Sequence, residues 1–87
     1  MSLIKKFDDN MNVISNTLRK YREEKDFSYE QLSAKLELMG ISIHRQSLYD
    51  IEQNKRTVKD YELFGIAKIL NIDVNDLLIE IKEKLKG

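Results

Sequence analysis

The fold is encoded most clearly by Arg22-Glu-Glu-Lys-Asp-Phe-Ser-Tyr-Glu-Gln-Leu-Ser-Ala-Lys-Leu36 and by Ser47-Leu-Tyr-Asp-Ile-Glu-Gln-Asn-Lys-Arg56. In the first stretch, Ser28 followed by Gln31 is a capping box, in which each side chain accepts a hydrogen bond from the other residue's backbone N–H. A helix is therefore expected to begin at Ser28 and to end at Gly40, because glycine favours the left-handed conformation that follows many helices.

The second stretch predicts another helix, from about His44 to Gln53. Leu48 and Ile51 are three positions apart, so they share one face of this helix and point to the core. Asn54 follows, and asparagine tolerates the left-handed conformation at a helix end. The opposite side of this helix is then open to solvent.

A long helix is expected before these two. Its apolar residues recur at intervals of three and four positions. They are Ile4, Phe7, Met11, Ile14, Leu18 and Tyr21. The pattern predicts a helix that begins near Asp8 or earlier and ends near Lys25, with Asp26 as a left-handed terminator.

Two more helices are expected after the second stretch. The fourth runs from Thr57 or Lys59 to Leu70, and the fifth from Asp73 to about Lys86. The apolar stripe of the fifth is Leu77, Leu78, Ile81 and Leu85. No strand alternation, linker or repeat occurs, so the sequence predicts an all-α fold of five helices around one core. We expect a single domain over 1–87, with its core at about 12–80, a first-helix extension over 1–11 and the last helix ending within 81–87.

Composition excludes several classes of function. The 87 residues include no cysteine and one histidine, which excludes disulfides, thiolate metal sites, cysteine nucleophiles and histidine clusters. Three glycines provide no phosphate-cradling loop, and no set of histidine, acid and nucleophile suggests an enzyme. We therefore expect no catalysis, no metal and no cofactor.

Charge and hydropathy bear on the partners. The 15 basic and 15 acidic residues balance, so any nucleic-acid binding has to rest on local clustering of positive charge. The sequence has no run of 18 consecutive apolar residues, which is the length that a membrane-spanning helix would need. The start of the chain becomes acidic at Asp8 and Asp9, which is unlike a signal peptide. A cytoplasmic protein is expected.

Five features occur in a fixed order along the chain. They are an arginine late in the first helix, a serine-capped second helix with Gln31-Leu-Ser-Ala-Lys-Leu36, a third with Leu48-x-x-Ile-Glu52, a short basic exit at Lys55-Arg56 and a fourth with Ala67-x-x-Leu70. At these residues the chain resembles the phage repressor and Cro-like (XRE-type) helix-turn-helix family, over roughly 12–80. The resemblance implies a lambda-repressor-like DNA-binding domain, whose second helix lies across the DNA backbone and whose third enters the major groove.

The resemblance also implies which residues read bases. The groove-facing positions are Arg45, Gln46, Tyr49 and Asp50, on the side of the helix opposite its buried face. Glutamine pairs with adenine N6 and N7, and arginine with guanine O6 and N7 or with a phosphate. An aspartate accepts a hydrogen bond from a cytosine amine. The alternative for each is an ordinary solvated surface residue.

The DNA backbone needs contacts of its own. The candidates are Tyr29, His44, Asn54, Lys55 and Arg56, with Lys35 and Lys59 as secondary ones. Tyr29 follows the Ser28 cap, where the free amides of a helix N-terminus attract a phosphate. His44 is also expected to cap the third helix. The alternative is that the charged residues merely solubilise the surface.

Two residues have a structural role in the resembled family. Arg22 and Glu52 occupy positions that form an internal ion pair between the first helix and the end of the third. The alternative is two independent surface charges. If the pair is buried, removal of one partner leaves the other charge stranded at a cost of roughly 3–5 kcal/mol.

The chain departs from the family between Leu36 and Ile51, where it is longer than the usual compact turn. The extra residues lie within Leu38-Met-Gly-Ile-Ser-Ile43. They are expected to extend the second helix by a turn and to lengthen the connector, with Ile41 and Ile43 packed beneath it. This departure affects the position of His44 and Arg45 most.

Double-stranded DNA is the expected partner, and a homodimer is expected because specific binding normally needs two half-sites about 34 Å apart. Two apolar stripes extend past the expected core: Ile4, Phe7 and Met11, and Leu78, Ile81 and Leu85. The C-terminal helix is the favoured interface. The predicted function is a sequence-specific transcription regulator that acts as a repressor. The alternative is an antitoxin, or another protein-binding module on the same fold, with weak or no DNA binding and a toxin as its partner.

Overall fold

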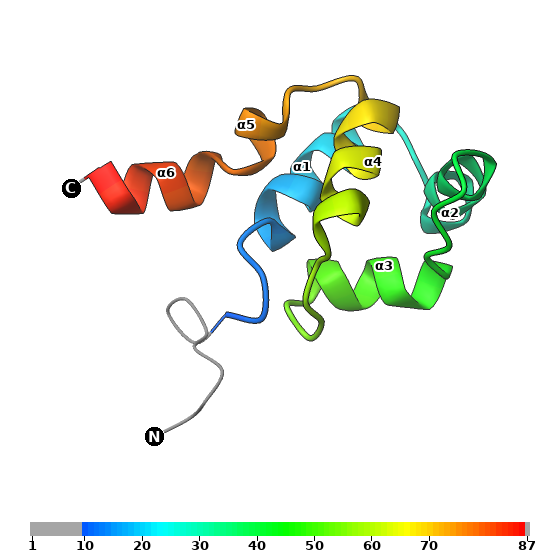
Figure 1. The fold of residues 1–87 in the computed structure, drawn as a ribbon, viewed down its shortest axis with the longest axis horizontal. Coiled ribbons are helices and arrows are strands. Elements are labelled where there is room, and N and C mark those ends of the chain that lie inside the picture. The colour runs from blue at the N-terminus through cyan, green and yellow to red at the C-terminus, as the bar shows by residue number, and fades with distance from the viewer. Residues whose placement is uncertain (1–9, 87) are drawn as a thin grey trace.

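The computed structural model describes residues 10–86, with Lys86 described by its backbone alone. Every regular element in this part of the chain that extends over several residues is an α-helix, which confirms the all-α fold class (Figure 1). The helices are α1 (Ser15–Glu24), α2 (Tyr29–Leu38), α3 (Arg45–Glu52), α4 (Asp60–Leu70), α5 (Val74–Leu77) and α6 (Ile79–Lys86).

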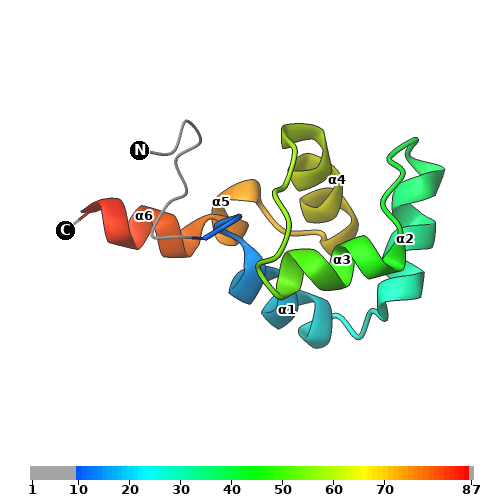
Figure 2. The same cartoon turned by 90° about the horizontal axis from the view of Figure 1, so that it is seen from below.

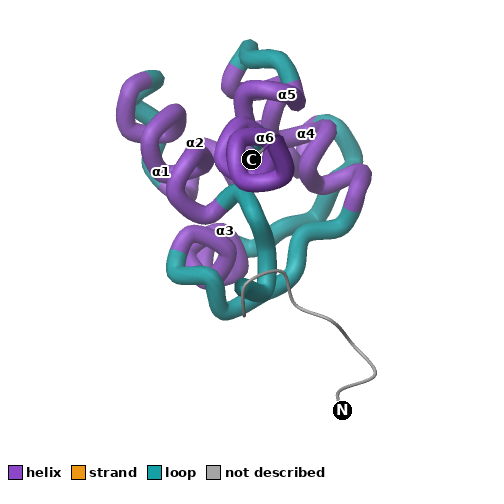
Figure 3. Tube along the Cα trace, turned by 90° about the vertical axis from the view of Figure 1, so that its left-hand side faces the viewer, coloured by secondary structure: helices purple, strands orange, loops and turns teal. Residues whose placement is uncertain are grey.

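The core lies where α1, α2, α3, α4 and α5 meet. Its side chains are the apolar residues spaced at helical intervals in the sequence, and nearly all have no solvent exposure. They are Ile14, Leu18, Leu32, Leu36, Ile43, Leu48, Ile51, Ile66, Ala67, Leu70 and Leu77. Figure 3 shows α3 along the lower side of this group, with α6 projecting from the other helices along the line of sight.

The predicted capping box opens α2. The Gln31 backbone N–H donates to Ser28 Oγ at 3.1 Å, and the Ser28 backbone N–H donates to Gln31 Oε1 at 2.9 Å. Two free amides of the first turn thereby gain partners. The helix ends at Leu38, and Gly40 follows with φ +84°, a backbone conformation that residues other than glycine rarely adopt.

The long connector between α2 and α3 is anchored to the core, as the sequence predicted. Ile43 is buried, and the Ser33 hydroxyl donates to the Ile43 carbonyl at 2.7 Å. Ile41 lies against α4 at Gly65, where an added Cβ would be only 2.4 Å from Ile41 Cδ1. Gly65 therefore leaves space for the connector in the middle of α4.

The first helix begins later than predicted. Residues 10–14 are not helical, and α1 begins at Ser15. Asn12 provides the reason, because its Oδ1 accepts from the Ile14 N–H at 3.0 Å while its Nδ2 donates to the carbonyls of Ile51 and Arg56. These bonds hold the chain outside the helix. The Ile4 and Phe7 part of the expected stripe lies outside the described residues.

The expected fifth helix is divided at Leu78, which has φ −92° and ψ 10°. The result is two helices, α5 and α6, so the fold has six in the described chain rather than five. Leu77 is fully buried, whereas Leu85 in α6 is 70% exposed and does not form part of the core. Leu78 still packs against the core, and Leu85 does not, because α6 extends beyond the other helices (Figure 1).

Removal of the Ser28 cap tests how α2 is initiated. We expect Ser28→Ala to lower the free energy of unfolding by about 1 kcal/mol, since the Gln31 amide loses its acceptor. Urea unfolding followed by circular dichroism measures the change. Ser42→Ala, at an exposed position in the connector, is the control and should change stability by less than about 0.5 kcal/mol. Equal effects of the two substitutions would contradict the role of the cap.

Candidate nucleic-acid interface

One side of α3 is fixed in the core and the other side is exposed. Leu48 and Ile51 have no solvent exposure. Arg45, Gln46 and Tyr49 are exposed. Figure 2 views the molecule from the side on which α3 lies, and α3 crosses the middle of the view with no helix in front of it. The structure therefore places three of the four predicted base-reading residues on an open helix face.

The ends of α3 are set by two local contacts. His44 is the N-cap, and its Nδ1 accepts from the Gln46 backbone N–H at 3.2 Å. Asn54 follows the helix in the left-handed conformation, with φ 60°. The exposed side chains of α3 thus project from a short helix whose start and end are both specified by sequence.

The four predicted base readers contact one another or a neighbour through exposed bonds. Arg45 pairs with Glu30 of α2, and Gln46 Nε2 donates to Asp50 Oδ1 at 3.2 Å. The ring of Tyr49 meets the ring of Tyr29 edge-on, with 5.8 Å between centroids. Exposed ion pairs contribute at most about 1 kcal/mol, so Arg45 is available to exchange Glu30 for another partner.

The Glu52 carboxylate at the end of α3 is buried and held from three sides. Arg22 donates through Nε to Glu52 Oε2 at 2.6 Å and through Nη2 to Oε1 at 3.2 Å. The Tyr29 hydroxyl donates to Oε1 at 2.8 Å, and Arg19 lies 3.7 Å away. The hydrogen bond to Glu52 raises the pKa of Arg22 above its usual value, and burial followed by the Glu52 contact raises the pKa of Tyr29.

The Tyr29 side chain is engaged within the protein. Its hydroxyl hydrogen is already donated to Glu52, and the Arg22 guanidinium lies 4.2 Å from the centre of its ring. Tyr29 is therefore a partner in the pair that joins α1 to α3, and its side chain does not supply a free donor to a phosphate. No pattern in the sequence indicated that a tyrosine would join this pair.

Asn54 is also engaged within the protein. Its Oδ1 accepts from the backbone N–H groups of Met11 and Asn12 at 2.6 and 3.2 Å. Its Nδ2 donates to Asn10 Oδ1, to the Asn12 carbonyl and to Ser15 Oγ. Every side-chain polar atom of Asn54 has protein partners, so this side chain joins the end of α3 to the segment before α1.

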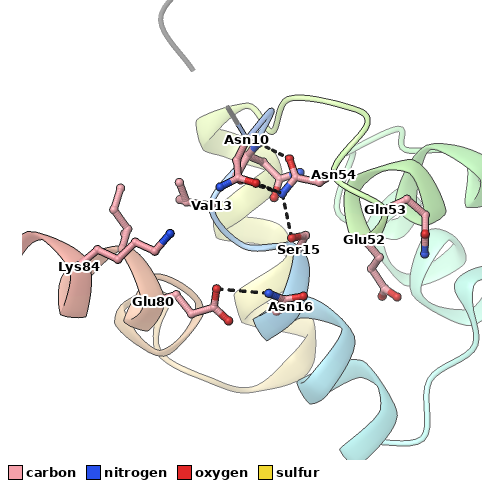
Figure 4. Close-up of a pocket in the computed structure, with 11 residues that line it drawn as sticks. Asn10, Val13, Ser15, Asn16, Glu52, Gln53, Asn54, Glu80 and Lys84 are labelled. Carbon is pink, nitrogen blue, oxygen red and sulfur yellow. Dashed lines mark hydrogen bonds between the residues drawn. The ribbon is translucent and has the colours of Figure 1, made fainter. Parts of the chain in front are cut away.

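The asparagines line a polar cavity of about 430 Å³ between the start of α1, the end of α3 and α6 (Figure 4). Asn16 reaches across it to Glu80 Oε2 at 3.5 Å. Asn12, which no sequence pattern marked, is buried here and donates to the last turn of α3 at Ile51 and to the loop after it at Arg56. The hydrogen bonds of the asparagines along this cavity therefore link the segment before α1 to the end of α3.

Arg56 is paired with a buried carboxylate. Its Nη1 and Nη2 donate to Glu62 Oε1 and Oε2 at 3.0 and 2.9 Å, and the Lys59 backbone N–H donates to Oε1 at 2.9 Å. Burial acts to raise the pKa of Glu62, but these bonds outweigh it and leave that pKa below its ordinary value. The Arg56 side chain, which is predicted to contact the DNA backbone, is therefore held against α4.

The remaining predicted backbone contacts are lysines. Lys55 leaves the end of α3 and is exposed, and its backbone N–H donates to the Asp50 carbonyl at 2.8 Å. Lys59 and Lys35 are exposed as well. Lys55 is thus the first exposed cation after α3 in the sequence.

Two absences concern the described part of the chain. Residues 10–86 include no group of three histidine, cysteine, aspartate or glutamate side chains that could hold a metal ion. In the same part of the chain, no helix has the length and apolar character that a bilayer crossing requires.

The Arg22–Glu52 pair generates a prediction about stability. We expect Arg22→Ala to lower the free energy of unfolding by about 3–5 kcal/mol, because it strands a buried carboxylate. Arg19→Ala, which removes a longer and more exposed contact with the same carboxylate, should cost less than about 1 kcal/mol. Denaturant unfolding compares the two arginines, and equal losses would show that Glu52 is not held mainly by Arg22.

Glu62 generates a prediction about pH. Because its pKa is lowered on folding, its charged form stabilises the native state above its ordinary pKa of about 4.5, and this stabilisation is lost as the pH falls. We expect Glu62→Gln to destabilise the protein most near neutral pH. The difference in unfolding free energy from wild type should shrink as the pH falls below the ordinary pKa of about 4.5. Urea unfolding from pH 7 to pH 3 measures it, with exposed Glu83→Gln as control. A pH-independent difference would contradict this role.

Comparison with known proteins agrees with the geometry. The chain matches the family model described as helix-turn-helix over residues 18–77, from α1 to the end of α5. No curated protein and no solved structure gives a significant match. The match covers well over half of the chain and contains the whole α2–α3 unit. The chain therefore belongs to the XRE-type helix-turn-helix family and is a DNA-binding transcription regulator of that type.

Proposed function

We propose that this protein binds a specific sequence in double-stranded DNA and represses transcription there, with α3 in the major groove. The observation that carries the proposal is the division of α3 into two faces. Leu48, Ile51 and Glu52 are buried and fix the helix, while Arg45, Gln46 and Tyr49 are exposed on its other side. A rigid helix with an open polar face fits the width of the major groove.

Base reading is assigned to Arg45, Gln46, Tyr49 and Asp50. The Gln46 amide and the Asp50 carboxylate are already 3.2 Å apart, so they present a donor and acceptors side by side. Gln46 matches the N6 and N7 edge of adenine, and Arg45 matches guanine once it leaves Glu30. Asp50 is repelled by phosphates, and so favours a position above a cytosine amine.

Backbone contacts are assigned to the residues that flank α3. Lys55 supplies the positive charge at its C-terminal end, and His44 lies at its N-terminal end. The N-terminus of α2 presents further backbone N–H groups beside Arg45, and these attract a phosphate. Tyr29, Asn54 and Arg56 act indirectly in this scheme, since their side chains hold the elements that carry the contacts.

Repression follows from occupancy alone. A small protein seated in the major groove of a promoter excludes other proteins from the same DNA, and needs no second contact to do so. Activation would require a further surface that touches the polymerase. We place this activity in the cytoplasm, where the DNA of a bacterium or phage is accessible.

Substitution of the two leading base readers tests the proposal. We expect the double variant Arg45→Ala, Gln46→Ala to lose the preference for its selected DNA sequence by about 1–3 kcal/mol for each bidentate contact removed. Its circular dichroism spectrum and unfolding midpoint should match those of wild type, because both side chains are exposed. The affinity for a selected duplex and for a scrambled duplex gives the measurement. An unchanged preference would contradict the assignment.

Substitution of Lys55 should act differently. We expect Lys55→Ala to weaken binding to every duplex alike and to reduce the slope of log affinity against log salt by about 1, because one phosphate contact is lost. Lys68→Ala, on an exposed part of α4, is the matched control and should leave both quantities unchanged. Loss of sequence preference in Lys55→Ala, or the same salt slope as wild type, would show that Lys55 does not bind a phosphate.

A further inference from the structure

Four large apolar side chains are exposed where α2 ends and α4 begins. Leu38 is 88% exposed, Met39 41%, Tyr61 52% and Phe64 57%. We call these four side chains the α2–α4 patch. The base-reading and backbone roles proposed above use none of them, and each exposes apolar surface to water at a cost in free energy.

The patch draws on two helices that pack against each other. Tyr61 and Phe64 are three positions apart, so they are neighbours on the surface of α4. Ile41 bridges from the α2 side, because it contacts α4 at Gly65, next to Phe64. Figure 2 shows the end of α2 and the start of α4 at the same, upper edge of the molecule, with α3 running below them.

The area of the patch suits a subunit interface. Its exposed side chains amount to on the order of 400 Å² of mostly apolar surface, within the range at which such patches mark interaction sites. A stable interface buries about 800 Å² on each partner, and its centre is apolar while its rim is polar. The patch is large enough to be that centre, with the polar residues around it as the rim.

We propose that the α2–α4 patch binds the same patch on a second copy of this chain. A two-fold axis that leaves both α3 outer faces on one side of the dimer has to run along the viewing direction of Figure 2. Rotation by half a turn about such an axis sets the end of α2 against the start of α4 in the other copy. Leu38 and Met39 then pack on the partner's Tyr61 and the partner's Phe64.

The charges next to the patch are complementary under the same rotation. Glu37 precedes Leu38 at the end of α2, and Lys59 is the N-cap of α4, with Nζ 5.8 Å from the centre of the Tyr61 ring. Both charged residues are exposed. The rotation brings Glu37 towards the partner's Lys59 twice, once on each side of the axis, so the surface is complementary to itself in charge as well as in hydropathy.

The spacing of the two α3 helices fits DNA, and this step rests on the function proposed above. The molecule is 19 Å across in its shortest dimension, which is the direction that joins the copies (vertical in Figure 2). Adding a side-chain contact layer of about 8–10 Å sets the centres of the two copies roughly 30 Å apart. One turn of B-DNA separates half-sites by about 34 Å.

The same geometry disfavours α6 as the interface. It lies at one end of the 38 Å long axis, roughly along the direction in which α3 runs (Figure 2). Two copies joined there would set their α3 helices nearly end to end, at a spacing set by the 38 Å long axis instead of the 19 Å short one. The exposed Leu85 of α6 therefore provides a matched control.

Sedimentation velocity without DNA tests the interface. We expect wild type to be a dimer at about 100 µM, and Leu38→Glu and Phe64→Glu each to weaken dimerisation at least tenfold, because each buries charge at the centre of the contact. Leu85→Glu should dimerise like wild type. Circular dichroism checks that the variants are folded. A monomeric wild type, or dissociation by Leu85→Glu alone, would overturn the proposal. A monomeric wild type would do so even if another protein were found to bind the patch.

Disulfide trapping gives a second reading, since the chain has no cysteine of its own. We expect an oxidised mixture of Leu38→Cys and Phe64→Cys chains to form the mixed cross-link at least tenfold faster than Leu85→Cys forms a cross-link with itself. Equal rates would overturn the interface. Neither measurement uses DNA, so a dimer that binds no DNA would refute the proposed function, and a DNA-binding monomer would refute the interface alone.

Discussion

The position of the α3 helix depends on one buried carboxylate, that of Glu52. Arg22 from α1 and Tyr29 from α2 both bond to it, so three helices meet at a single charge. A buried charge without such partners would be strongly destabilising, which makes this arrangement sensitive to the loss of any of them. Because Glu52 is the last residue of α3, these contacts fix the orientation of α3 relative to α1 and α2, and with it the direction in which its exposed side chains point.

A second set of polar contacts fixes the chain just beyond α3. Asn54 joins the end of α3 to the segment before α1, and Arg56 joins the following loop to Glu62 of α4. The side chains nearest to the outer face are thus divided by role. Those that bond within the protein hold α3 and its exit in place, and those that remain exposed are free to meet a nucleic acid.

Much of the fold was predictable because its signals are local. Helix capping at Ser28 and the inward pair of Leu48 with Ile51 depend on residues within one turn of each other, and the sequence displays them directly. The start of α1 was not predictable, since Asn12 is held by carbonyls about 40 positions away. The pairing of Arg56 with Glu62 was not predictable either, because the charge of a loop arginine does not show which carboxylate of the protein it will meet.

The most direct test of the central claim is to map which residues of the chain touch DNA. A duplex selected from random sequence is titrated into isotope-labelled protein, and backbone amide shifts are followed by NMR. We expect the largest shifts within residues 44–50 and at Lys55, on the exposed side of α3 and in the loop that follows it. Shifts centred on α6, or absence of any duplex that binds, would contradict it.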